Sequence, residues 1–164
     1  SRYDKFDYYF KNIKCLKNYK SELEQILIDF SQIVKKNLIL CKLTPNIELF
    51  LKRLNTLKKN LYVISASDEE ELTEIFRIRN LNVYFKRILG SPSNKIENIS
   101  KLNISDVKET IFFGDSLSDY NAAMHFNFDF VYIKNYSLWK VPENIKKSSG
   151  YREINNFSFL KISN

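Results

Sequence analysis

The chain has 164 residues, 44% of them hydrophobic, which suits one globular domain with a small appendage. No apolar run reaches the roughly 18 residues that a membrane-spanning helix needs. The net charge is +7, but the lysines are scattered among acids, which argues against a dedicated nucleic-acid or membrane surface. Cys15 and Cys41 have no disulfide-framework or metal-ligand spacing, so we expect reduced thiols and a cytoplasmic protein.

The first 43 residues show helical periodicity and no strand pattern. Aromatic side chains recur at helical spacing at Tyr3, Phe6 and Phe10. Apolar residues then keep the three-and-four spacing of an amphipathic helix between Leu23 and Leu38. We therefore expect residues 1–43 to form a helical segment separate from the rest of the chain.

From Thr44 onward, helix-like and strand-like segments alternate. Thr44 and Pro45 are typical of a helix start, and Ser67 with Glu70 forms a capping-box pattern at the start of a second helix. Apolar runs that predict strands lie at 61–64, 111–113 and 128–133, a short strand is expected at 86–89, and a further apolar run lies at 157–162. Helices are expected between these strands. This alternation predicts an α/β fold over residues 44–164, in which a Rossmann-like parallel sheet is covered by helices on both faces.

An acidic turn follows the strand at 111–113. Gly114 ends the apolar run, Asp115 comes next, and Asp119 lies four residues on, where a helix is expected to begin. In a parallel sheet such a turn lies at the carboxyl edge, where ligands bind. Two carboxylates there would suit Mg²⁺. The alternative is that Asp115 caps the helix and Asp119 is solvated in its first turn.

Two further polar residues follow neighbouring strands. Ser65 ends the strand at 61–64, and Lys95 begins a helix after the strand at 86–89. Either could be structural, as a strand-end serine or a solvated lysine. If all these strands are parallel, however, a hydroxyl, an ammonium and a carboxylate pair meet at one edge of the sheet. Those are the groups that phosphoryl transfer needs, so we expect Ser65, Lys95 and Asp115 to converge on one phosphate-sized position.

The order of these residues resembles the motifs of the haloacid dehalogenase superfamily, most closely its phosphatases with a helical cap. The stretches that carry the resemblance are 63–67, 90–95 and 112–123. The resemblance implies that residues 1–43 belong to the cap and that Ser65 binds a phosphoryl oxygen. It also implies that Lys95 neutralises the phosphate and an aspartyl-phosphate intermediate. Asp115 would ligate Mg²⁺, and Asp119 would act beside the metal, on a metal-bound water or on Lys95.

The chain departs from the family at its start, because no strand ending in D-x-D is present. Asp4 and Asp7 are three residues apart and follow no apolar strand, and Asp29 lies inside the predicted amphipathic helix. We therefore expect that the sequence lacks an N-terminal segment of about 40 residues. That segment would supply the nucleophile and a central strand between those ending at Ser65 and Gly114. The 164 residues alone would then be inactive.

The expected function of the complete protein is Mg²⁺-dependent hydrolysis of a small phosphorylated metabolite through an aspartyl-phosphate. Neither nucleic acid nor a membrane is expected as a partner. Three alternatives stay open: a phosphomutase, a dehalogenase, or a catalytically silent binding or regulatory domain of the same fold.

Overall fold

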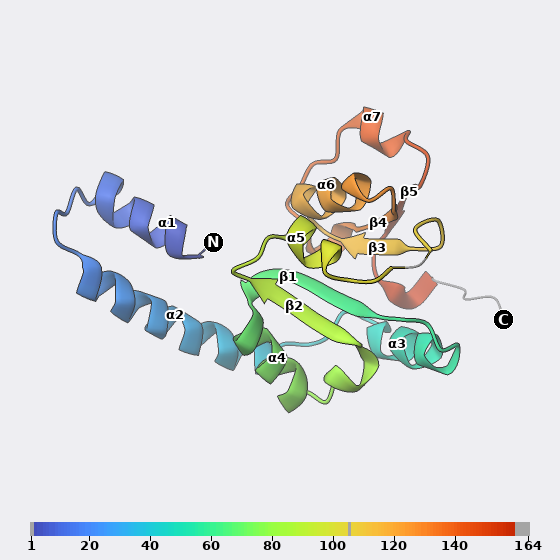
Figure 1. Cartoon of the computed structure of the whole chain (residues 1–164), viewed down its shortest axis with the longest axis horizontal. Coiled ribbons are helices and arrows are strands. Elements are labelled where there is room, and N and C mark those ends of the chain that lie inside the picture. The colour runs from blue at the N-terminus through green and yellow to red at the C-terminus, as the bar shows by residue number, and fades with distance from the viewer. Residues whose placement is uncertain (1, 105, 160–164) are drawn as a thin grey trace. The chain divides into compact units, whose positions relative to one another are not determined.

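The computed structural model describes residues 2–104 and 106–159, which belong to two compact units (Figure 1). The first unit combines Ser1–Lys42 with Leu61–Ser93, and the second combines Leu43–Asn60 with Asn94–Asn164. Both contain parallel strands flanked by helices, which confirms the predicted α/β class. The division into a cap segment over 1–43 and a core over 44–164 stays a prediction. Within the described ranges, no helix is long and apolar enough to cross a membrane.

A helical hairpin begins the first unit (Figure 1). Helix α1, Arg2–Tyr8, continues as a π-helix, η1, Tyr9–Ile13, and is followed by α2, Lys20–Leu40. Aromatic contacts join the two arms. Phe6 meets Phe30 edge to face at 5.5 Å between ring centroids, and Phe10 stacks on Tyr19 at the same distance. The predicted helices are thus present, and their aromatic side chains join them into a hairpin that was not predicted.

The strands of the first unit form a parallel pair. Strand β1, Tyr62–Asp68, lies beside β2, Arg87–Ser91, and the connection contains α4, Glu69–Ile78, and a short 3₁₀ turn, η2, Asn82–Tyr84. Helix α4 packs on both strands and against α2.

The predicted capping box at the start of α4 is wrong. Ser67 still belongs to β1, so the helix begins later than the box would place it. Asp68 is the N-cap, and its side chain accepts a hydrogen bond from the backbone N–H of Glu71 at 3.0 Å.

Three parallel strands form the sheet of the second unit, in the order β3, β4, β5. They span Ile111–Gly114, Asp129–Ile133 and Tyr151–Ile154. Helix α6, Leu117–His125, connects β3 to β4 and packs on both. Strand β5 was not predicted, because its sequence YREI contains no apolar run.

Helices cover both faces of this sheet. The remaining elements of the unit are α3, Ile47–Thr56; α5, Lys95–Ser100; η3, Lys134–Tyr136; α7, Glu143–Lys146; and η4, Phe157–Phe159. Phe113 of β3 meets Phe50 of α3, whereas Phe130 of β4 meets Tyr120 of α6. Phe130 lies opposite Phe112, so Phe113 and Phe130 point to opposite faces. The unit therefore has a helix–sheet–helix layering.

The start of α3 differs from the prediction. The helix begins at Ile47, because Asn46 adopts a left-handed backbone with φ of 61° and acts as the N-cap. Asparagine tolerates that conformation better than most residues. Thr44 and Pro45 therefore precede the helix. Of the predicted apolar run at 157–162, residues 160–162 lie outside the described part of the chain.

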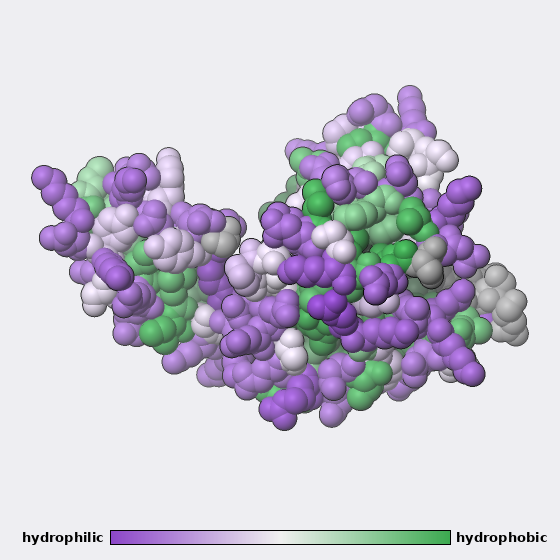
Figure 2. Space-filling view, in the orientation of Figure 1, coloured by the Kyte–Doolittle hydropathy of each residue, from purple (hydrophilic) through white to green (hydrophobic). Residues whose placement is uncertain are grey.

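The described strands form two sheets rather than one. Strand β1 pairs only with β2, and β3 pairs only with β4, so each keeps one edge that no described strand covers. Such an edge presents unpaired backbone N–H and C=O groups. Apolar side chains also reach the surface, among them Ile33 and Leu40 on α2 and Ile111 on β3. Figure 2 shows hydrophobic surface among the hydrophilic side chains. The expected extra strand stays a prediction.

Candidate active site

The acidic turn lies directly after β3 and opens α6. Ser116 is the N-cap, and its hydroxyl accepts a hydrogen bond from the N–H of Asp119 at 3.3 Å. In return, the Asp119 carboxylate accepts one from the N–H of Ser116 at 3.1 Å. This reciprocal capping box fixes Asp119 in the first turn of the helix. Ser116 therefore fills the capping position that the structural alternative gave to Asp115.

Both oxygens of the Asp119 carboxylate are engaged by donors of the protein. Oδ2 accepts from the N–H of Asp115 at 3.2 Å, from the N–H of Ser116, and from the Ser116 hydroxyl at 2.6 Å. Oδ1 accepts from the Lys95 ammonium. The residue is only 5% exposed, so it is not the solvated first-turn acid of the alternative interpretation. A carboxylate held in this way orients other groups.

Lys95 is placed by its own helix cap. It is the first residue of α5, where Asn94 and Glu97 form a second capping box with both hydrogen bonds at 3.0 Å. The Lys95 and Asp119 side chains are 16% and 7% exposed. An ion pair so shielded from water interacts more strongly than a surface pair. The structure thus brings together two predicted site residues that lie 24 positions apart.

Asp115 is the exposed carboxylate of the cluster. Its pKa is raised, first because the surrounding protein removes part of its hydration and second because the Asp119 carboxylate lies close by. The charge of Lys95 offsets part of this effect. A bound cation would relieve the same electrostatic cost.

The residues present fit a magnesium site to which these residues contribute a single carboxylate. Mg²⁺ is usually held by one or two carboxylates, with waters and substrate phosphate completing the octahedron. Asp115 has the chemistry and exposure for one such ligand, whereas Asp119 is occupied by Lys95 and the turn. Across residues 2–104 and 106–159, no group of three or more His, Cys, Asp or Glu side chains is placed to hold a metal. Asp115 would therefore need ligands from water, substrate or elsewhere.

Ser65 belongs to the first unit, where it lies inside β1 rather than at its end. Regular pairing with β2 stops at Ile64 and resumes only at Asp68, so Ser65 sits in an irregular part of the ladder. Its hydroxyl accepts a hydrogen bond from the N–H of Ser67 at 3.1 Å. Its predicted role in binding phosphate stays a prediction.

Sequence reasoning missed several residues that shape the turn. The capping-box spacing of three residues could have revealed two pairs, Ser116 with Asp119 and Asn94 with Glu97. Ser137, whose hydroxyl donates to the carbonyl oxygen of Asp115, carried no local signal because it lies 22 residues away.

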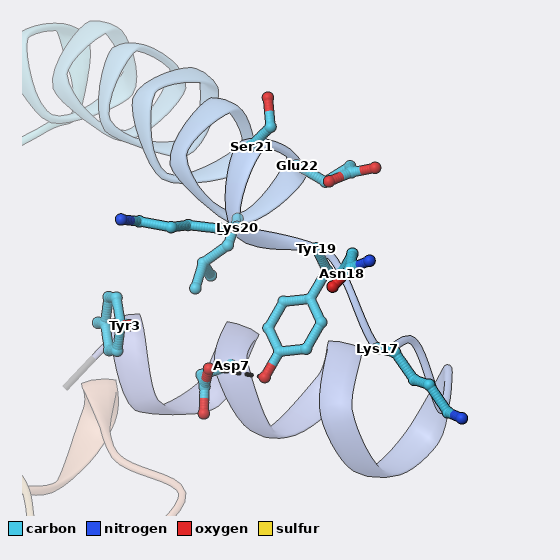
Figure 3. A pocket seen from close by; sticks show the side chains of 9 residues that line it. Tyr3, Asp7, Lys17, Asn18, Tyr19, Lys20, Ser21 and Glu22 are labelled. Carbon is cyan, nitrogen blue, oxygen red and sulfur yellow. Dashed lines mark hydrogen bonds between the residues drawn. The ribbon is translucent and has the colours of Figure 1, made fainter.

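An open cavity of about 470 Å³ lies in the helical hairpin of the first unit (Figure 3). Asp7 and Tyr19 line it, and the Tyr19 hydroxyl donates to the Asp7 carboxylate at 3.0 Å. Lys17 and Lys20 extend away from this pair (Figure 3). Because its central polar groups satisfy one another, the cavity offers no constellation comparable to the acidic turn.

Comparisons with known proteins identify the family of the chain. The profile of the haloacid dehalogenase-like hydrolases matches residues 4–133, so the chain belongs to this family. A search of curated proteins finds no match.

Solved structures of the family share the fold. A candidate phosphatase from Clostridium difficile is 20% identical with a TM-score of 0.70, over 90% of this chain and 72% of the other. A family hydrolase from Streptococcus pneumoniae is 19% identical with a TM-score of 0.65, over 86% and 69%. A candidate hydrolase from Bacillus subtilis, bound to magnesium, is 17% identical with a TM-score of 0.60, over 83% and 58%. At these identities the likeness establishes the fold.

Proposed function

We propose that the protein is a Mg²⁺-dependent phosphatase that hydrolyses a small phosphorylated metabolite. The observation that carries the proposal is the shielded Lys95–Asp119 ion pair next to the exposed carboxylate of Asp115. A fixed ammonium such as that of Lys95, beside a carboxylate such as Asp115 that can ligate a metal ion, stabilises the charge on phosphoryl oxygens during transfer. The magnesium-bound relative from Bacillus subtilis supports the choice of metal.

Each residue of the cluster would have a separate task. Asp115 would ligate Mg²⁺, which when bound neutralises charge on the phosphate and orients it. The Lys95 ammonium has three N–H donors, so the one given to Asp119 leaves others for phosphate oxygens. Asp119 would hold Lys95 in place. Ser65 is proposed to donate its hydroxyl to another phosphoryl oxygen.

The nucleophile is assigned to a segment outside the 164 residues. Its carboxylate oxygen would attack phosphorus, the P–O ester bond would break, and a general acid would protonate the leaving oxygen. Water would then hydrolyse the acyl phosphate and release inorganic phosphate. A parallel strand on the open edge of β3 would end beside Asp115, which is why this edge supports the assignment.

The test uses protein expressed from the complete reading frame, stripped with EDTA and reloaded with Mg²⁺. Its substrates are p-nitrophenyl phosphate and, separately, a 2-haloacid. We expect inorganic phosphate to appear only with Mg²⁺, and no halide. Halide release without phosphate release would favour the dehalogenase alternative. Release of neither product would favour the silent domain and contradict the proposal.

A further inference from the structure

The peptide bond between Asp115 and Ser116 is held from both sides. Its carbonyl oxygen accepts a hydrogen bond from the hydroxyl of Ser137. Its N–H donates to Oδ2 of Asp119 at 3.1 Å. Because one peptide plane carries both groups, the two contacts together restrict rotation of the backbone that bears the Asp115 side chain.

Ser137 is itself fixed by the sheet. Its hydroxyl oxygen accepts from the N–H of Trp139 at 2.9 Å, and the carbonyl of Trp139 accepts from the Tyr132 hydroxyl at 2.6 Å. Tyr132 lies on β4 and is only 5% exposed. The rings of Tyr132 and Trp139 also meet edge to face at 5.5 Å. The hydrogen-bond chain therefore runs from a buried strand residue to the acidic turn.

We propose that Ser137 is a positioning residue that holds the Asp115 carboxylate in the orientation Mg²⁺ requires; this inference rests on the proposed function. Mg²⁺ demands near-ideal octahedral geometry, so a freely rotating ligand binds it poorly. The single proton of Ser137 goes to the Asp115 carbonyl, and one lone pair accepts from Trp139. Ser137 thus acts through Asp115 and does not touch the metal.

The experiment measures Mg²⁺ binding by calorimetry on protein from the complete reading frame, without substrate. Ser137→Ala should raise the Mg²⁺ dissociation constant about 10-fold or more, the usual effect of losing a group behind a metal ligand. Ser137→Thr keeps the hydroxyl in an extended backbone and should stay within about 2-fold of wild type. The control is Ser148→Ala, which removes a hydroxyl that donates to the carbonyl of Ile145 at 2.6 Å.

Fluorescence gives a second readout. Trp139 is the single tryptophan of the 164 residues, and its backbone N–H is hydrogen-bonded to the hydroxyl of Ser137. Its emission should therefore change as Mg²⁺ binds. In Ser137→Ala this change in emission should need a higher Mg²⁺ concentration, by the same factor as the rise in the dissociation constant measured by calorimetry. If that variant does not fold, Ser137→Cys supplies a weaker donor of similar shape and should raise the dissociation constant several-fold.

The possible outcomes distinguish the positioning role of Ser137 from the proposed function on which it rests. Equal dissociation constants for wild type, Ser137→Ala and Ser148→Ala would overturn the role of Ser137 while leaving the magnesium site intact. Wild-type protein that binds no Mg²⁺, or binds it equally well after Asp115→Asn, would overturn the proposed function and this inference with it.

Discussion

Replacing Lys95 by methionine tests whether the shielded ion pair organises the site. Methionine keeps much of the apolar stem but leaves the Asp119 carboxylate, 7% exposed, without its cation. Breaking a buried pair in this way costs about 3–5 kcal/mol. The contacts that remain, two backbone N–H groups and the Ser116 hydroxyl, favour the low end of that range. We expect a loss of about 3 kcal/mol in the free energy of unfolding, or about 6–12 °C in Tm.

Urea unfolding, followed by circular dichroism, measures this loss. The matched control is Lys146→Met, which removes an ion pair with Glu143, a side chain that is 73% exposed. Exposed pairs contribute little, so the control should unfold like wild type. Adding Asp119→Asn to Lys95→Met should restore part of the stability, because the unpaired charge is then removed. The reasoning is refuted if Lys95→Met shifts the midpoint no further than Lys146→Met.

Two other changes probe the turn itself. The pKa of Asp115 is higher in the folded protein than in the unfolded chain. Its contribution to the free energy of unfolding is therefore fully present below the unfolded pKa, where the carboxyl is protonated, and is lost as pH rises through the folded pKa. Asp115→Asn should therefore unfold at a higher temperature than wild type at pH 7, and this gain should disappear in scans near pH 3; a lower Tm at pH 7 would contradict the assignment. Gly114→Ala would place a Cβ 2.3 Å from Cβ of Asp119, a side chain held by several hydrogen bonds, and should cost about 1–3 kcal/mol in urea unfolding. Ser148→Ala is the control. If Gly114→Ala were as stable as wild type, the contact with the Asp119 side chain would relax freely and the prediction would be wrong.

The sequence was informative where structure depends on local pattern. Periodicity identified α2, and the apolar run followed by glycine located β3 and the acidic turn. Helix starts were less predictable, because cap choice depends on neighbours. Asp68 displaces Ser67 as the cap of α4, since β1 continues past Ser67. The left-handed conformation of Asn46 likewise moves the start of α3.

The sequence named the residues of the candidate site but few of the contacts between them. Lys95 and Asp115 were identified from their place after strands, and the contact of Asp119 with Lys95, 24 residues away, was one of two that the family resemblance implied. The contact between Ser137 and Asp115 depends on how the loop after β4 returns to the turn. No pattern within either segment encodes such pairings, because they arise from strand order and packing.

The most direct measurement of the central claim is kcat/KM for p-nitrophenyl phosphate with saturating Mg²⁺, comparing Asp115→Asn with Asp106→Asn in the complete protein. Asp106 accepts backbone hydrogen bonds from Lys108 and Glu109 at 3.1 and 3.3 Å, a role that asparagine can keep, so this variant should match wild type. Asp115→Asn should lose at least about 100-fold, more than is usual for groups behind a metal ligand. Equal turnover by the two variants would contradict the account.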